Sequence, residues 1–205
     1  MPPVNMKKTS TSAQKLHNLL KGNRYTLRPF TEQDISDRYI GWLNDPQVNR
    51  FLEVRFVHQT RDTVLEFVRS FYGEVEKYMW GIFPNDATEP VGTTTLYDIK
   101  HNHGTGEIGL MIGEMEYRGK GASNEAMELV LEFAFETLKL RRATGGSISL
   151  NHDMNFTFKR LGFTCEGKQR AAWYVSPETY VDGFRWSILA DEWRTGHQSA
   201  ANNRD

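Results

Sequence analysis

A glycine-rich turn joins a strongly apolar segment to a long amphipathic one, and few folds accommodate that junction. Residues 107–112 form a nearly unbroken apolar run with the length of a buried strand. The turn Arg118-Gly119-Lys120-Gly121 follows shortly after, and residues 122–138 then repeat apolar side chains at helical spacing. A strand that leads through such a turn into a helix predicts an α/β protein whose helices pack on a sheet.

The rest of the chain alternates strand-like and helix-like segments. Strands are predicted at 25–30, 78–83, 90–99, 143–150, 164–175 and 180–190. Helices are predicted at 31–43, with Thr31 as N-cap, and at 59–72 and 153–161. Strands thus precede and follow a central β-α-β-α unit, which predicts a mixed sheet with helices on its faces.

Length and composition predict one globular domain without a nucleic-acid or membrane partner. We expect a flexible arm at 1–23, the domain at 24–194 and a disordered tail at 195–205. A formal net charge of −1 gives no general attraction for nucleic acid or an anionic membrane, and no apolar run is long enough to span one. A single cysteine, Cys165, and no signal-like segment predict a cytoplasmic protein, with that thiol buried at a strand start.

The start of the predicted long helix has the chemistry of an anion site. The first N–H groups of a helix have no partner within it, and with the helix dipole they attract anions. Gly119 and Gly121 let a phosphate approach the backbone closely. Arg118 and Lys120 add charge, and Ser123 adds a hydroxyl. The spacing matches neither common nucleotide motif, so the turn alone leaves open whether it binds pyrophosphate or is simply tight.

Two segments resemble the GNAT superfamily of N-acetyltransferases. Residues 111–126 are similar to its acetyl-CoA-binding motif, R/Q-x-x-G-x-G/A, with Arg118 and Gly121 on the pattern. Asn151, followed by residues 158–163, resembles the family's downstream segment N-x-x-S-x-x-x-Y/F-x-K-x-G-F. The resemblance extends over most of the chain outside the tails. It implies an acyltransferase with the GNAT fold, a mixed, mostly antiparallel sheet of about seven strands flanked by helices.

Under this resemblance acetyl-CoA is the cosubstrate. Strand residues 111–113 would pair with its pantetheine arm, and the N–H groups of 119–123 would hold its pyrophosphate. Asn151 would bind the pantetheine, although a role as cap of the next helix explains an asparagine here equally well. Phe158 would pack near the thioester. The implied coenzyme residues are Met111, Ile112, Gly113, Arg118, Gly119, Lys120, Gly121, Ala122, Ser123, Asn151 and Phe158. Ser123 and Met154 depart from the residues that the family usually carries at these positions, and Phe158 stands where many relatives have a tyrosine.

Two residues are candidates for the general base. Glu107 opens the central strand, where relatives often carry an acid that faces the acceptor. His103 resembles a position that is often histidine. Either could take the proton of the amine directly or through one water, and the alternatives are a strand-end carboxylate and a surface histidine. His101 and His103 form an H-x-H pair without a cysteine or carboxylate cluster, so no metal is expected.

The acceptor is expected to be a small-molecule primary amine, most specifically a nucleotide-linked amino-deoxysugar of surface-glycan biosynthesis. The candidate substrate residues are Trp42, Arg50, Glu53, Arg55 and Tyr97. Guanidiniums would meet a diphosphate and aromatic rings would stack on a sugar or base. A solvated helix end with an ion pair from Glu53 explains the same residues. The alternative functions are a protein or peptide N-terminal acetyltransferase, as for ribosomal proteins, an acetyltransferase of small amines such as aminoglycosides or polyamines, and a non-catalytic CoA-binding interaction protein.

Aromatic side chains are frequent in the two predicted C-terminal strands. They are Trp173, Tyr174, Tyr180, Phe184 and Trp186. They are numerous enough to cover a homodimer contact, and they would equally well fill the core.

Overall fold

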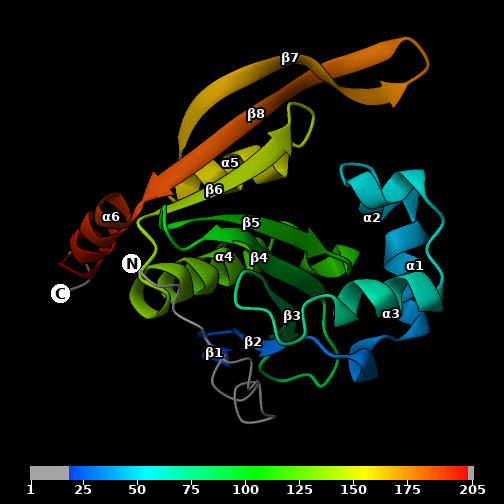
Figure 1. The fold of residues 1–205 in the computed structure, drawn as a ribbon, viewed down its shortest axis with the longest axis horizontal. Coiled ribbons are helices and arrows are strands. Elements are labelled where there is room, and N and C mark those ends of the chain that lie inside the picture. Colours follow the sequence, from blue (N-terminus) through cyan, green and yellow to red (C-terminus); the bar gives the residue numbers. More distant parts are fainter. Residues whose placement is uncertain (1–18, 203–205) are drawn as a thin grey trace, which may run out of the picture.

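The computed structural model describes residues 19–202, which form an eight-stranded sheet with helices on both faces (Figure 1). The strands are β1 (Leu20–Lys21), β2 (Tyr25–Pro29), β3 (Tyr78–Pro84), β4 (Gly92–Lys100), β5 (Thr105–Ile112), β6 (Arg142–Ile148), β7 (Thr164–Ser176) and β8 (Thr179–Leu189). Their order is β1-β2-β3-β4-β5-β6-β8-β7, and all neighbours are antiparallel except β5 and β6. The predicted mixed, mostly antiparallel sheet is confirmed, with one strand more than expected because Leu20–Lys21 pair with β2.

The helices divide the core into two clusters, one on each face of the sheet. They are α1 (Asp37–Asn44), α2 (Pro46–Asn49), α3 (Arg61–Arg69), α4 (Ala122–Glu132), α5 (His152–Arg160) and α6 (Ala190–Asn202). On one face α4, α5 and α6 bury side chains such as Met127, Phe158 and Trp193. On the other face α1, α2 and α3 pack against Met79 and Met111 of the sheet.

Local capping explains why the predicted first helix is divided. Thr31 forms a capping box with Asp34, but it begins only a short 3-10 helix, η2 (Glu32–Asp34). Ser36 then caps α1 by accepting a hydrogen bond from the backbone N–H of Tyr39. Asp45 ends α1 and caps α2, where Pro46 occupies the first position, at which a missing N–H costs nothing.

The parallel strands β5 and β6 separate along their length. They pair only at Thr105, Gly106 and Glu107 of β5, although both strands continue beyond this point. From Ile108 onward the side of β5 that faces β6 therefore has no strand partner, while its other side stays paired with β4 as far as Ile112. The end of β5 thus presents backbone groups toward an opening in the sheet.

β7 and β8 form a long arm along the edge of the sheet. In Figure 1 this arm passes over the molecule toward α2. Near its tip Arg55 donates to the backbone oxygen of Tyr174, and the rings of Phe56 and Tyr174 lie 6.0 Å apart. Of the aromatic residues predicted to cover a contact or fill the core, Trp186 is buried, whereas Tyr174 and Tyr180 are exposed.

The structure bears on the expectations for the two tails and for the cysteine thiol. Residues 1–18 and 203–205 of the predicted tails lie outside the described residues, and Leu20–Lys21 of the predicted arm form β1. The prediction of a buried Cys165 is wrong, because β7 is the edge strand and leaves this thiol exposed. Among the described residues no helix combines the length and hydropathy of a membrane span.

Candidate active site

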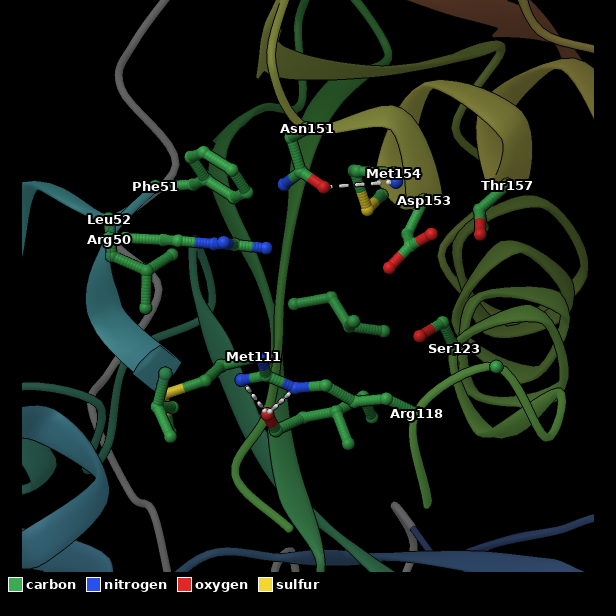
Figure 2. A pocket seen from close by; sticks show the side chains of 14 residues that line it. Arg50, Phe51, Leu52, Met111, Arg118, Ser123, Asn151, Asp153, Met154 and Thr157 are labelled. Carbon is green, nitrogen blue, oxygen red and sulfur yellow. Dashed lines mark hydrogen bonds between the residues drawn. The ribbon is translucent and has the colours of Figure 1, made fainter. Parts of the chain in front are cut away.

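Where β5 and β6 separate, the end of β5 and the start of α5 border a cavity of about 110 Å³ (Figure 2). The turn before α4 and the segment around α2 complete its walls. Figure 2 shows Arg50 and Phe51 on one side, Asp153 and Ser123 on the other. The lining residues are Val48, Arg50, Phe51, Leu52, Leu110, Met111, Ile112, Arg118, Gly119, Ser123, Asn151, Asp153, Met154 and Thr157. We call this the coenzyme cavity, after the cosubstrate that the sequence resemblance implies.

The turn into α4 has the backbone geometry of an anion site. Gly119 and Gly121 have φ of +70° and +86°, a left-handed conformation that glycine adopts without strain. Gly121 is the N-cap of α4. It has no side chain that could accept hydrogen bonds from the backbone N–H groups of the first turn. Gly119 and Ser123 line the cavity, so the start of α4 borders it. Nothing lies within 4 Å of a Cβ built on Gly119, which leaves room for a group as large as a phosphate to approach.

Arg24 is a residue of this site that the sequence did not indicate. Its Nη1 donates to the backbone oxygen of Lys120 at 2.9 Å, and its Nη2 lies 2.7 Å from where a Cβ on Gly121 would be. Glu125 of α4 accepts from the backbone N–H groups of Arg24 and Tyr25. The start of β2 therefore supports the turn from behind and adds a cation there. About a hundred residues separate these partners, so no local pattern connects them.

Arg118 is held against the end of β5. Its guanidinium donates twice to the backbone oxygen of Ile112, at 2.9 and 3.2 Å, and once to that of Gln47, at 2.9 Å. Burial lowers the pKa of Arg118, and the nearby Arg50 lowers it further. Two guanidiniums thus border the same cavity, with Asp153 as the nearby carboxylate.

Asn151 caps the next helix, which is one of the two roles considered for it, and its pantetheine contact stays a prediction. Its Oδ1 caps α5 by accepting from the backbone N–H of Met154 at 3.1 Å, and its side chain lines the cavity. Figure 2 shows its amide nitrogen pointing away from α5. Phe158 does not line the cavity. It is fully buried beneath Gly145 and stacks on Trp186, with ring centroids 5.6 Å apart.

Glu107 lies in a three-residue cluster at the last paired position of β5 and β6. Its carboxylate accepts from Arg185 of β8 at 2.8 and 3.3 Å and from the hydroxyl of Tyr97 at 2.9 Å. Burial and the adjacent carboxylate both raise the pKa of Tyr97, which therefore stays protonated as a donor. The hydrogen bond to Glu107 raises the pKa of Arg185. Tyr97, a predicted substrate residue, and Glu107, a predicted base, are thus brought together.

The structure separates the remaining predicted residues from one another. His103 lies in the turn between β4 and β5, beside the end of β5 opposite to the coenzyme cavity. Trp42 is buried and donates to Glu114. Arg50 faces the coenzyme cavity, and Arg55 is engaged with the β7–β8 arm. Glu53 is exposed at the start of the 3-10 helix η3 (Glu53–Phe56).

A second, larger cavity of about 420 Å³ lies between the sheet and α1, η3 and α3. Its floor is formed by Met79, by Thr93 and Thr95 of β4, and by Gly109 of β5. It shares Leu52, Leu110 and Met111 with the coenzyme cavity. The other lining residues are Tyr39, Leu43, Val54, Gln59, Val64 and Phe67. We call this the apolar cavity.

Comparison with known proteins finds acetyltransferases, both among family models and among relatives in sequence. Residues 24–164 match the family model of an acetyltransferase (GNAT) domain. The uncharacterized N-acetyltransferase p20 of Bacillus licheniformis is 25% identical over 173 residues, which cover 83% of this chain and 95% of p20. The putative ribosomal N-acetyltransferase YdaF of Bacillus subtilis is 28% identical over 65% of this chain and 70% of YdaF.

The fold also matches solved structures. The crystal structure of spermidine N-acetyltransferase from Vibrio cholerae in complex with CoA and spermine superposes with a TM-score of 0.75. The match covers 84% of this chain and 99% of that one, at 18% sequence identity. At this identity the likeness extends to the fold alone.

Proposed function

This chain belongs to the acetyltransferase (GNAT) family and is an N-acetyltransferase, and on that premise we propose that acetyl-CoA binds in the coenzyme cavity and acetylates the α-amine of a peptide or protein. The observation that carries the proposal is that two adjacent cavities share a wall formed by Leu52, Leu110 and Met111. One cavity borders a glycine turn suited to phosphate, and the other has on its floor Gly109 of β5, where an added Cβ would lie 3.5 Å from the ring of Tyr97, the partner of Glu107.

The residues of the coenzyme cavity fit a pantetheine diphosphate. The unpaired side of β5 offers backbone groups at 110–112 that could pair with the amides of the pantetheine arm. The start of α4, with Gly119, Gly121 and Ser123, could hold the pyrophosphate. Arg50 and Arg118 supply positive charge at the same cavity, and Asn151 supplies an amide donor.

The reaction requires a proton acceptor near the attacking amine. The nitrogen bonds to the thioester carbon, the C–S bond breaks, and the coenzyme leaves as a thiol after the thiolate takes a proton. We assign to Glu107 the removal of the ammonium or amine proton, directly or through one water, because it lies where β5 and β6 separate. Arg185 and Tyr97 fix the orientation of its carboxylate from two other strands.

The peptide α-amine replaces the amino-sugar acceptor as the favoured class. A nucleotide-linked sugar would need cations for its diphosphate beside the acceptor amine, but Arg50 faces the coenzyme cavity and Arg55 binds the β7–β8 arm. Nothing in the comparisons supports a sugar acceptor. YdaF, a putative ribosomal N-acetyltransferase, favours a protein amine instead.

The test measures acetyl-CoA-dependent thiol release with tripeptides that carry a free α-amine, using wild-type protein and Glu107→Gln. The variant keeps the size of the side chain but removes its basic group. We expect kcat to fall at least about 100-fold with an unchanged affinity for acetyl-CoA, since general bases contribute about 10²–10⁴-fold.

The matched control is Glu166→Gln. Glu166 also forms a two-fold ion pair with an arginine, Arg142, across strands, but it lines neither cavity. We expect this variant to keep its turnover. A Glu107→Gln enzyme with wild-type kcat would refute the assignment of the base. Tight coenzyme binding without turnover on any amine would favour a CoA-binding protein without catalysis.

A further inference from the structure

The apolar cavity has a lining whose chemistry restricts what it can bind. Eight of its lining side chains are hydrocarbons or thioethers. Five of them line this cavity alone, namely Leu43, Val54, Val64, Phe67 and Met79, and three lie on the wall shared with the coenzyme cavity, namely Leu52, Leu110 and Met111. The polar members are hydroxyls and one amide, from Tyr39, Gln59, Thr93 and Thr95. None of the lining residues is Asp, Glu, Lys, Arg or His.

The phenol of Tyr39, which is the acidic group of this lining, stays protonated near neutral pH. Burial raises the pKa of Tyr39 to about 12, and its hydroxyl is hydrogen-bonded to Thr93. The cavity therefore carries no charge that could pair with a cationic or anionic substituent. Placing an unpaired charge among such side chains is costly, whereas placing an apolar group there is favourable.

The position of the cavity connects it with the reaction. Leu110 and Met111 of β5 separate it from the coenzyme cavity. On its floor, a Cβ built on Gly109 would lie 2.7 Å from Oγ1 of Thr95 and 3.5 Å from the ring of Tyr97. Because Tyr97 donates to Glu107, this glycine keeps the floor open next to the proposed base. Cavities beside β1 and beside the β4–β5 turn share no lining residue with it.

We infer that the apolar cavity receives a bulky uncharged side chain next to the acceptor amine, so that the enzyme selects peptides with a large apolar first residue. This inference rests on the proposed function, because it assumes that the amine reaches the thioester from this side of β5. The volume of about 420 Å³ is ample for an aromatic or branched aliphatic side chain. A polyamine, which carries several cations, would meet no carboxylate in this lining.

The experiment compares the tripeptides Phe-Ala-Ala, Leu-Ala-Ala, Gly-Ala-Ala and Glu-Ala-Ala, with spermidine as a cationic amine. Thiol release gives kcat/KM for each, and calorimetry gives the affinity of each peptide for the protein with CoA. We expect Phe and Leu peptides to exceed the Gly peptide by about tenfold or more in both measurements, since an apolar side chain is transferred out of water. We expect Glu-Ala-Ala and spermidine to be the weakest.

The informative variant is Phe67→Glu, because Phe67 lines the cavity from α3 and is 51% exposed, so the fold should tolerate the change. It should remove most of the preference for Phe over Gly, while Phe67→Leu should retain it. The matched control is Phe156→Glu on α5, a residue that is 62% exposed and lines neither cavity. This control should keep the preference.

The outcomes separate the two proposals. Turnover without preference, or with preference for spermidine or Glu-Ala-Ala, overturns the inference and leaves the proposed function intact. Binding of Phe-Ala-Ala that depends on Phe67, but without turnover, supports the cavity's selectivity and contradicts the proposed acetylation of peptides. Faster transfer from long-chain acyl-CoA than from acetyl-CoA, with no dependence on the peptide's first residue, would show that the cavity takes the acyl group and would also overturn the inference.

Discussion

Ser123 occupies the second position of α4, and its side chain lines the coenzyme cavity. A negative charge in the first turn of a helix is favourable for the fold, but it would repel a bound pyrophosphate. Stability and coenzyme binding should therefore respond in opposite directions to a single charge at this residue.

We predict that Ser123→Asp raises the free energy of unfolding by about 0.3–1 kcal/mol through the helix dipole. The same variant should weaken CoA binding at least about tenfold, because two like charges at contact distance repel by about 1–4 kcal/mol. Urea denaturation and calorimetric titration with CoA measure the two quantities. Ser123→Asn, which has nearly the same shape without the charge, should bind CoA much more tightly than Ser123→Asp. Equal affinities for the two variants would place the pyrophosphate elsewhere.

Residues that act through a local pattern were predictable, and residues placed by distant contacts were not. The glycines at 119 and 121 were expected to let a phosphate approach, and the structure shows both in the left-handed conformation, with Gly119 lining the cavity. Arg24 could not be identified, because Glu125 and Lys120, which hold it, lie about a hundred residues away. Arg50 was expected at the acceptor, and only the path of the chain through α2 shows that it faces the coenzyme cavity.

At the scale of elements, Glu114 connects α1 to the segment between β5 and α4. Its carboxylate accepts from Nε of Arg38 and from Nε1 of Trp42. The hydrogen bond from Arg38 lowers the pKa of Glu114 in the folded protein, and burial opposes this only in part. A carboxyl group with a lowered folded-state pKa stabilises the fold above its unfolded-state pKa, and this contribution is lost as the pH falls through the folded-state value.

We predict that Glu114→Gln lowers the free energy of unfolding by about 1 kcal/mol at pH 7, because Gln keeps a neutral acceptor, worth about 0.5–1.5 kcal/mol, in place of a charged one, worth about 1.5–3 kcal/mol. The difference from wild type should shrink as the pH falls below about 4.3, the ordinary pKa of a glutamate. Urea denaturation at pH 7, 5 and 3.5 measures it. Glu66→Gln, at an exposed position of α3, is the control and should change stability little at any of these pH values. A difference that grows toward acid pH would contradict the account.

Elements in which apolar residues recur at a regular spacing were predicted well, but the residues at which they begin and end were not. The apolar spacing of 122–138 gives one helical segment, although its last turn is the π-helix η5 (Phe133–Thr137). The predicted helix 31–43 is divided because Ser36 offers a second cap that competes with continuation from Thr31. The separation of β5 from β6 has no sequence signal of its own, since pairing is a property of two distant segments.

At the scale of the whole molecule, the sheet brings one cavity to each side of β5. The coenzyme cavity borders α4 and α5, and the apolar cavity lies beneath α1, η3 and α3. Resemblance over the coenzyme segment was sufficient to predict the fold, and the coenzyme residues that it implies stay a prediction. The apolar cavity has no counterpart among the sequence predictions, because part of its lining comes from η3 and the irregular segments around it, which carry no motif. The homodimer expected from the aromatic C-terminal strands stays a prediction.

The most direct measurement is amide hydrogen exchange of the whole protein with and without CoA. The account predicts slower exchange at residues 108–112, whose backbone lacks a strand partner on the side facing β6, and at residues 118–123 of the turn. Residues 100–104, in the turn that holds His103, serve as the internal control and should exchange equally with and without CoA. Protection confined to other segments, or absent at saturating CoA, would contradict the placement of the coenzyme between β5 and α4.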